Sequence, residues 1–141
     1  MTDKELSGEP PTPRGLEKAI LIGHRVVECN LMTWARWFEA ASHLNERHVG
    51  NDDVGGMRVS TVFLGMNHQW GNGPKLWFET MVFGGPLHEM TQRYTTWEQA
   101  EAGHKFILAI AKGEAAVVRD KVKAELQRIA AAASTEGDAA P

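Results

Sequence analysis

The side chains best suited to binding lie together near the middle of the chain, between two apolar runs. Residues 65–75 combine amide and imidazole groups with one indole, contributed by Asn67, His68, Gln69, Trp70 and Asn72. A nucleobase stacks on an aromatic ring and hydrogen-bonds to amides, so this mixture suits a planar, nucleotide-like ligand. A connection of this length in a compact domain is more often functional than incidental. The alternative is a glycine-rich turn whose Trp70 folds back onto the core.

Glu79 stands in the middle of an apolar run, where a carboxylate needs a partner or a raised pKa. One interpretation is structural: an ion pair with Arg36, Arg58 or Arg93, or a hydrogen bond from Thr61. The other is that Glu79 contacts a ligand or exchanges a proton with it. On the second interpretation Glu79, Arg36 and Arg93 form pocket walls beside the polar loop.

A basic row lies at helical spacing in the first third of the chain. Arg36, His43 and Arg47 are separated by seven and four residues, which places them on one side of a helix. An anionic ligand or partner could use this row. Glu39 and Glu46 lie nearby, and ordinary ion pairing along the helix is the better explanation.

The sequence contains no recognisable metal site or catalytic motif. Two histidines at HxH or HExxH spacing would point to a metal, and no pair has it among His24, His43, His48, His68, His88 and His104. His104 falls on an apolar helix face, where we expect a core histidine bonded to a backbone carbonyl. Cys29 is the only cysteine, so no internal disulfide forms. Without a P-loop, a GxGxxG or a GxSxG motif, we expect a protein that is not an enzyme and binds no cofactor or metal.

Composition bounds the protein class. The 141 residues are 43% hydrophobic and 23% charged, and the net charge is −3, which is ordinary for one globular domain and argues against nucleic acid as the main partner. No apolar run approaches the roughly 18–20 residues that span a bilayer. The first residues lack the apolar core of a signal peptide, so the expected location is the cytoplasm. We expect a disordered leader over residues 1–16, one domain over 17–133 and a disordered tail over 134–141.

Two strands with a long connection, residues 57–83, are the expected centre of the fold. Both runs are rich in β-branched and aromatic residues. If Leu64 faces Leu76, the antiparallel pairs are Phe63 with Trp77, Thr61 with Glu79, Val59 with Met81 and Met57 with Phe83. A slip of one residue would exchange the two faces. Residues 18–29 favour a tight hairpin, or one bent strand at the sheet edge, around Gly23.

Three helices follow from apolar spacing. The first, residues 30–49, begins at the N-cap Asn30 and packs across a face of the hairpin. The second, residues 95–112, begins with a capping box that pairs Thr95 with Glu98 or Thr96 with Gln99. Gly113 separates it from a third helix, residues 114–133.

These elements predict a small α+β domain. Its antiparallel sheet is centred on the hairpin 57–83 and is covered by the helices 30–49 and 95–112. The third helix packs alongside or makes a subunit contact. Because both sheet faces and the last helix present apolar surface, we expect a homo-oligomer.

Four longer motifs resemble a family of small, mostly uncharacterised proteins encoded by bacteriophages and prophages. They are LMTWARWFEAA at 31–41, VSTVFLGMNH at 59–68, LWFETMVFGG at 76–85 and RYTTWEQAEAGH at 93–104. The resemblance covers about residues 20–108. It implies a phage accessory protein made in the bacterial cytoplasm, and it carries no activity or site residues with it.

The leading functional hypothesis is a non-enzymatic accessory protein that binds a nucleotide-like ligand or a component of the host's defences. Small phage proteins of this kind often act by binding, including by sequestering nucleotide messengers. A structural or assembly protein of the virion is the second hypothesis. The third is a nucleic-acid-binding regulator that uses Arg36 and Arg47.

Overall fold

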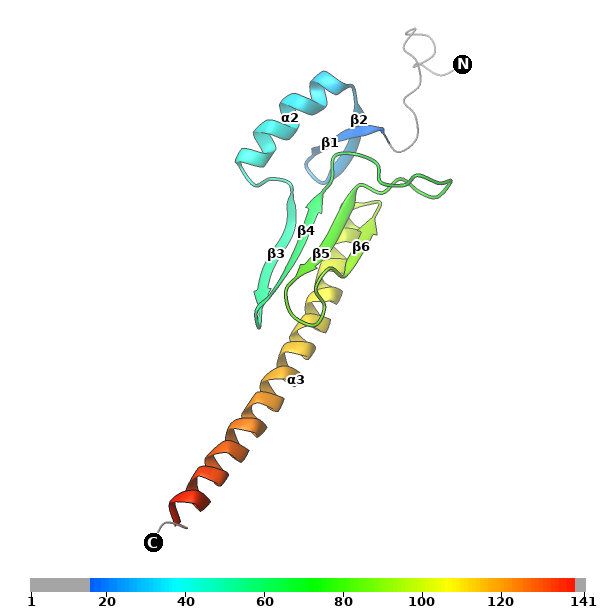
Figure 1. Ribbon diagram of the computed structural model, residues 1–141. Helices are drawn as coiled ribbons and strands as arrows, with labels where there is room; N and C mark the ends of the chain where they lie inside the picture. Colours follow the sequence, from blue (N-terminus) through cyan, green and yellow to red (C-terminus); the bar gives the residue numbers. More distant parts are fainter. Residues whose placement is uncertain (1–15, 139–141) are drawn as a thin grey trace, which may run out of the picture.

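The computed structural model describes residues 16–138 as an α+β domain with a hairpin, a short helix, a four-stranded antiparallel sheet and a long helix (Figure 1). The elements in chain order are β1 Lys18–Ile22, β2 Arg25–Cys29, α2 Leu31–His43, β3 His48–Val54, β4 Met57–Phe63, β5 Phe78–Phe83, β6 Thr91–Tyr94 and α3 Trp97–Asp138. The expected α+β class with an antiparallel sheet is confirmed, but within these residues the domain has two helices where three were expected. Residues 1–15 of the expected leader and 139–141 of the expected tail lie outside the described residues.

The hairpin of β1 and β2 takes the tighter of the two expected forms. The strands pair antiparallel from Lys18 opposite Cys29 to Ile22 opposite Arg25. Gly23 turns the chain with a φ of +62°, a conformation that glycine adopts without strain. The amide of Ala19 donates to the carbonyl of Gly65 over 3.0 Å, which fastens β1 to the segment after β4.

Helix α2 begins where the sequence predicts and ends six residues earlier. The side chain of Asn30 accepts from the amide of Thr33 over 2.9 Å, as an N-cap does. The helix ends at His43, and the predicted continuation to residue 49 is wrong. Asn45 has a φ of +56°, and asparagine tolerates this left-handed conformation well enough to end a helix.

Helix α2 lies beyond one end of the sheet and packs mainly on β1 (Figure 1). Its deepest contact with the sheet is the ring of Trp37, which meets the ring of Phe63 edge-on with centroids 5.6 Å apart. The predicted packing of this helix across a face of the hairpin 57–83 is therefore not observed. Apolar spacing shows which side of a helix is buried, and it does not identify the element that buries it.

The four-stranded sheet has the order β3-β4-β5-β6, with every neighbouring pair antiparallel. Strand β3 was not predicted. Its sequence, HVGNDDV, contains glycine, asparagine and aspartate, which are depleted in strands. It forms because it is an edge strand that pairs along nearly all of β4.

The register between β4 and β5 differs by one residue from the expected one. The observed pairs are Phe63 with Phe78, Thr61 with Thr80 and Val59 with Val82. Consequently Phe78, Thr80 and Val82 are buried, while Glu79 and Met81 are half-buried on the opposite face. Both alternatives place large apolar groups on each face, so alternation alone could not choose between them.

Helix α3 is one continuous helix of 42 residues, so the prediction of separate helices at 95–112 and 114–133 is wrong. One glycine costs only about 1 kcal/mol relative to alanine, too little for Gly113 to end a helix of this length. The helix also continues through residues 134–138 of the expected tail. The capping box pairs Thr96 with Gln99: the amide of Gln99 donates to the Thr96 hydroxyl over 3.1 Å, and the Gln99 side chain accepts from the Thr96 amide over 3.3 Å.

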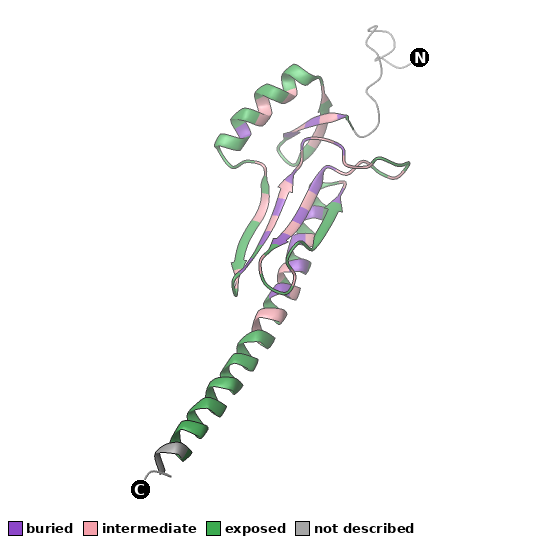
Figure 2. Ribbon diagram, viewed as in Figure 1, coloured by how far each residue is buried: buried purple, intermediate pink, exposed green. Residues whose placement is uncertain are grey.

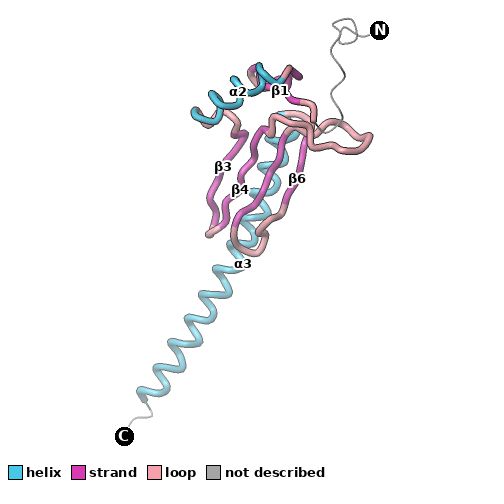
Figure 3. Tube along the Cα trace, turned by 45° about the horizontal axis from the view of Figure 1, so that its top comes forward, coloured by secondary structure: helices cyan, strands magenta, loops and turns pink. Residues whose placement is uncertain are grey.

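The first half of α3 covers one face of the sheet (Figure 3). Its Ile107 and Ala111 are buried together with Met57, Val59 and Val82. A second cluster forms around Phe63, Phe78 and Trp77 at the end of the sheet near the hairpin. Within the described residues no helix is both long and apolar enough to cross a bilayer.

Candidate functional site

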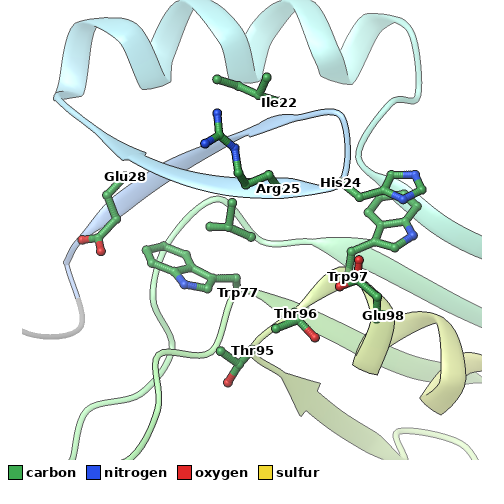
Figure 4. Close-up of a pocket in the computed structure, with 10 residues that line it drawn as sticks. Ile22, His24, Arg25, Glu28, Trp77, Thr95, Thr96, Trp97 and Glu98 are labelled. Atoms are coloured by element: carbon green, nitrogen blue, oxygen red, sulfur yellow. The ribbon is translucent and has the colours of Figure 1, made fainter.

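Aromatic and polar side chains line a cavity of about 600 Å³ between the β1–β2 hairpin and the start of α3. Figure 4 shows His24 and Trp97 at one end, Glu28 at the other and Trp77 between them. Three parts of the chain, far apart in sequence, supply these walls. The hairpin contributes one side, the residue before β5 the floor, and the junction of β6 and α3 the opposite side.

Two tryptophans and one histidine supply flat walls. Trp77 is only 4% exposed, and its amide donates to the carbonyl of Tyr94 over 2.9 Å, so its backbone is fixed. The His24 ring lies on the Trp97 ring, with centroids 3.9 Å apart and planes 7° apart. Trp97 is held in turn by its indole N–H, which donates to Glu101 over 3.2 Å. The stacked rings of His24 and Trp97 therefore form an aromatic surface beside the cavity, while Trp77 belongs to the buried core and closes the cavity.

Charged side chains stand beside the aromatic walls. Arg25 is exposed and forms no ion pair within residues 16–138, so its charge is available to an anion. Glu28 is engaged by Lys75, whose Nζ lies 2.9 Å from the carboxylate. Partial burial alone would lower the pKa of Lys75, but the hydrogen bonds and charges of Glu28 and Glu17 together raise it. Lys75 is thus held protonated and neutralises that end of the cavity.

The start of α3 contributes to the same cavity through Thr95, Thr96, Trp97 and Glu98. The amides of Thr95 and Thr96 both donate to the side chain of Gln99. The first-turn amides of a helix have no intrahelical acceptors, and they give that end a partial positive charge. Here the amides of Thr95, Thr96 and Gln99 are satisfied within the capping box, and the Glu98 carboxylate lies beside them, so this end of the cavity suits a hydrogen-bond donor of a ligand.

The six residues predicted to bind a ligand do not line this cavity. Asn67 is fully buried and holds the connection between β4 and β5 in place. Its Oδ1 accepts from the amides of Gln69 over 2.8 Å and Leu76 over 2.9 Å, and its Nδ2 donates to Glu17 over 3.3 Å. The structural contacts of Asn67 are thus already complete.

The other loop candidates are exposed or half-buried. Trp70 is 64% exposed near the tip of the connection and does not fold back onto the core. The centroid of the His68 ring lies 6.4 Å from that of Trp70, and the His68 Nδ1 is hydrogen-bonded to the carbonyl of Met66. Arg36 is exposed on α2, which Figure 1 and Figure 3 both place on the other side of the molecule from the loop. The structure does not gather these three into one pocket.

Glu79 and Arg93 are brought together on the face of the sheet opposite α3. They are direct partners across β5 and β6, and the Arg93 Nε lies 2.9 Å from the Glu79 carboxylate. One of the three ion pairs considered from the sequence is therefore present. The pair is a structural explanation for a carboxylate in an apolar strand.

The cavity residues had only weak signals in the sequence. Trp97 is part of the apolar spacing of α3, Trp77 belongs to the run before β5, and His24 follows a turn glycine. Each has an ordinary structural explanation on its own. Only the packing of the hairpin against the start of α3 makes one site of them.

A second polar cluster lies between the sheet and α3. The His104 Nε2 is 2.6 Å from the Asp52 carboxylate, and its Nδ1 is 2.7 Å from the Thr61 hydroxyl. The hydrogen-bond network continues from the Thr61 hydroxyl to the Thr80 hydroxyl over 2.5 Å and from there to the Tyr94 hydroxyl over 3.0 Å. His104 is a core histidine as expected, but its partners are side chains instead of a backbone carbonyl.

The proton positions in this hydrogen-bond network follow from the group at its end, the Asp52 carboxylate. The Asp52 carboxylate only accepts, so the Nε2 of His104 donates to it. In neutral His104 the Nδ1 then accepts from Thr61, which accepts from Thr80, which accepts from Tyr94. Every hydroxyl in the network is satisfied, as buried polar groups require.

Carboxylate, imidazole and hydroxyl in this order are also the parts of a nucleophilic catalyst. Thr61 is completely buried, however, and it does not line the cavity described above. Without a path for a substrate to its hydroxyl, the cluster is best explained as a support for the sheet–helix interface. The close fit requires glycine at position 50, where an added Cβ would lie 2.6 Å from the His104 ring.

Among residues 16–138, no three histidine, cysteine, aspartate or glutamate side chains come together as a metal site would require. Comparisons with protein-family models, with curated proteins and with solved structures found no match to the chain. The interpretation of the site therefore depends on its own geometry and chemistry.

Proposed function

We propose that this chain is a non-enzymatic binding protein that holds a small, planar, nucleotide-like ligand in the cavity between the β1–β2 hairpin and α3. The supporting observation is the stacked pair of His24 and Trp97, which lines the cavity beside the buried Trp77. Base-on-aromatic stacking tolerates different bases and contributes about 1–3 kcal/mol per base. A volume of about 600 Å³ is within the usual range for small-ligand sites.

Charge supports the same class of ligand. Arg25, which forms no ion pair within residues 16–138, can meet a phosphate. Glu28 is neutralised by Lys75, so it does not repel an anion as an unpaired carboxylate would. Glu98 supplies an acceptor for an amino group of a base or for a ribose hydroxyl.

The biological setting in this proposal comes from the resemblance to phage-encoded proteins. A ligand held without chemical change is removed from whatever would otherwise bind it. We propose that the protein acts as a phage accessory factor in this way, by sequestering a nucleotide-like signal of the bacterial host's defences.

Native mass spectrometry of the protein, purified gently from expressing bacterial cells, tests this proposal. The expected result is a nucleotide-sized adduct on the wild type that is lost in His24→Ala and in Arg25→Ala. Both residues are exposed, so these variants should remain folded. Quenching of tryptophan fluorescence by a panel of mononucleotides and dinucleotides gives the affinity of each variant.

Trp70→Ala and Arg36→Ala are the matched controls, because both also remove an exposed, large side chain. They should keep the adduct. If Trp70→Ala abolished the adduct while Arg25→Ala kept it, the site would be the β4–β5 loop and the cavity proposal would be wrong. If the wild type carried no adduct and no nucleotide quenched its tryptophan fluorescence, a host protein would be favoured as the partner.

A further inference from the structure

The second half of α3 has no partner within the described part of the chain. Every side chain described from Val117 to Thr135 is exposed, and Figure 2 shows this part of the helix projecting from the domain. At 1.5 Å per residue, residues 117–138 extend about 33 Å. Isolated helices of this size are marginal in water, and the valines at 117, 118 and 122 lower the helix propensity further. Packing against another surface would stabilise it.

The exposed half carries a continuous apolar stripe. The stripe consists of small and aliphatic residues at spacings of four, three and four: Ala111, Ala115, Val118, Val122, Leu126, Ile129 and Ala133. At 3.6 residues per turn, all seven lie within roughly 40° of one line along the helix. An 11-residue repeat of this kind drifts by only about 20° per repeat, which gives two paired helices a slight right-handed supercoil. Ala111 and Ala115 already pack on the sheet, so the same face that forms the core continues into solvent.

We propose that this stripe pairs with the same stripe of a second copy of the chain, in antiparallel orientation. Such a pairing centres on Leu126 opposite its own symmetry mate. It places Val122 opposite Ile129 of the second copy, and Val118 opposite Ala133. The two-fold axis then passes beside Leu126, and one patch is complementary to itself, as a closed dimer requires. Val122, Leu126 and Ile129 are each 53–60% exposed in the single chain, and this contact would cover them.

The domain itself decides the orientation. The sheet already occupies the stripe face of α3 over its first half. In a parallel pair, the first half of the partner's helix would have to lie where that sheet packs. In the antiparallel pair only the exposed halves overlap, and the two domains lie at opposite ends of the helix pair.

Charges beside the stripe fit the antiparallel pair. Glu125 forms an ion pair with Arg128 of its own helix. Across the two-fold axis, each Glu125 comes level with Gln127 of the second copy, within one turn of both that copy's Glu125 and its Arg128. The arginines neutralise this contact and can exchange partners across it. On the other flank of the stripe, Arg119 comes level with Ala132 and Ala133 of the second copy, so no like charges meet there.

The same charges disfavour a membrane surface as the occupant. Amphipathic helices that bind membranes carry a polar face rich in lysine and arginine. Here four basic side chains are balanced by three acidic ones between residues 114 and 128: Arg119, Lys121, Lys123 and Arg128 against Glu114, Asp120 and Glu125.

Sedimentation equilibrium of the full-length chain at micromolar concentration tests the proposal. The expected mass is twice the 15.6 kDa of one chain. Val122→Glu with Leu126→Glu should raise the dimer dissociation constant at least about 100-fold, because the interface would bury unpaired charges. Ala124→Glu with Gln127→Glu is the matched control, since it puts equal charge on the opposite side of the helix and should leave the dimer intact. A monomeric wild type, or a stripe variant that dimerises like the control, would overturn the proposal.

Disulfide trapping tests the orientation of the two helices. The fluorescence of the five tryptophans reports folding of the domain independently of the helix pair, because no tryptophan lies beyond residue 97. In a Cys29→Ser background, chains carrying Val122→Cys are mixed with chains carrying Ile129→Cys. The antiparallel pair predicts that the mixed disulfide forms at least about tenfold faster than either self-linked dimer. Faster self-linking of Val122→Cys would show a parallel pair and contradict the geometry proposed here. This inference does not depend on the ligand, since the cavity lies at the other end of α3.

Discussion

At the scale of single residues, the polar side chains of the described part of the chain fall into two groups: those that form hydrogen bonds within the fold and those that do not. Asn67 makes three hydrogen bonds to its loop and one to Glu17. Thr61, Thr80 and His104 satisfy one another inside the sheet–helix interface. Within residues 16–138, the side chains of His24 and Arg25 form no such hydrogen bonds, and both line the cavity. A binding role is better assigned to the second group, because binding would not compete with folding.

Asn67→Ala should lower the free energy of unfolding by about 1–3 kcal/mol, because two backbone amides of the loop lose their acceptor. Urea denaturation followed by tryptophan fluorescence measures this loss. Asn72→Ala, an exposed position in the same loop, is the control and should change the stability little. Equal stability of the two variants would show that the loop does not depend on Asn67.

At the scale of elements, the two halves of α3 differ in whether the sheet covers them. Its first half is fixed by the sheet, its second half has no cover in one chain, and Gly113 stands where the two meet. An added Cβ at Gly113 would meet nothing within 4 Å, so no contact explains a glycine there. The helix is continuous because its neighbours on both sides form helices well.

Gly113→Ala should therefore stabilise the protein by up to about 1 kcal/mol, because alanine loses less backbone entropy in a helix. Thermal unfolding followed by circular dichroism measures the change. Ala109→Gly, at an exposed position of the same helix, should produce a change of similar size in the opposite direction. If Gly113→Ala destabilised the protein, the helix would bend or break at Gly113, as the sequence suggested.

At the scale of the whole molecule, separate parts of the chain are joined by a few groups that titrate at high pH. Lys75 connects the segment before β5 to Glu28 of the hairpin and to Glu17. Tyr94 connects β6 to the Thr80 hydroxyl, and burial raises its pKa above the ordinary 10.0, with the hydrogen bond between Tyr94 and Thr80 offsetting part of this. The pKa of Lys75 is also raised, above 10.5, by the net effect of its acidic partners against burial.

Both groups bind their protons more tightly when the protein is folded. Their contribution to stability is therefore complete below about pH 10 and is lost as the pH rises through the raised values. We expect the free energy of unfolding to fall steadily above pH 10. Tyr94 is the only tyrosine, so the tyrosinate absorbance of the folded protein reports its pKa directly. Lys75→Arg should delay the loss, because arginine stays charged, and a flat stability profile would contradict the expectation.

The secondary structure was predictable where local signals were strong. Asn30 as an N-cap is confirmed. The sequence left two registers open for the capping box and two forms for the segment around Gly23, and the structure has the Thr96–Gln99 register and the tight hairpin. The end of α2 and strand β3 were missed because β3 is stabilised by pairing with β4 and not by its own propensity. The continuity of α3 was missed because the penalty for Gly113 is small beside the packing of the first half.

By itself, the sequence determined the α+β class, the two strands at the centre, the main helix starts and the burial of His104, because these follow from periodicity and capping between near neighbours. Only the tertiary structure decided the strand register and the partner of α2. It also decided which polar residues share a site, since His24, Trp77 and Trp97 come from three separate segments. Such choices depend on contacts between residues far apart in the chain, and a local pattern is equally compatible with several of them.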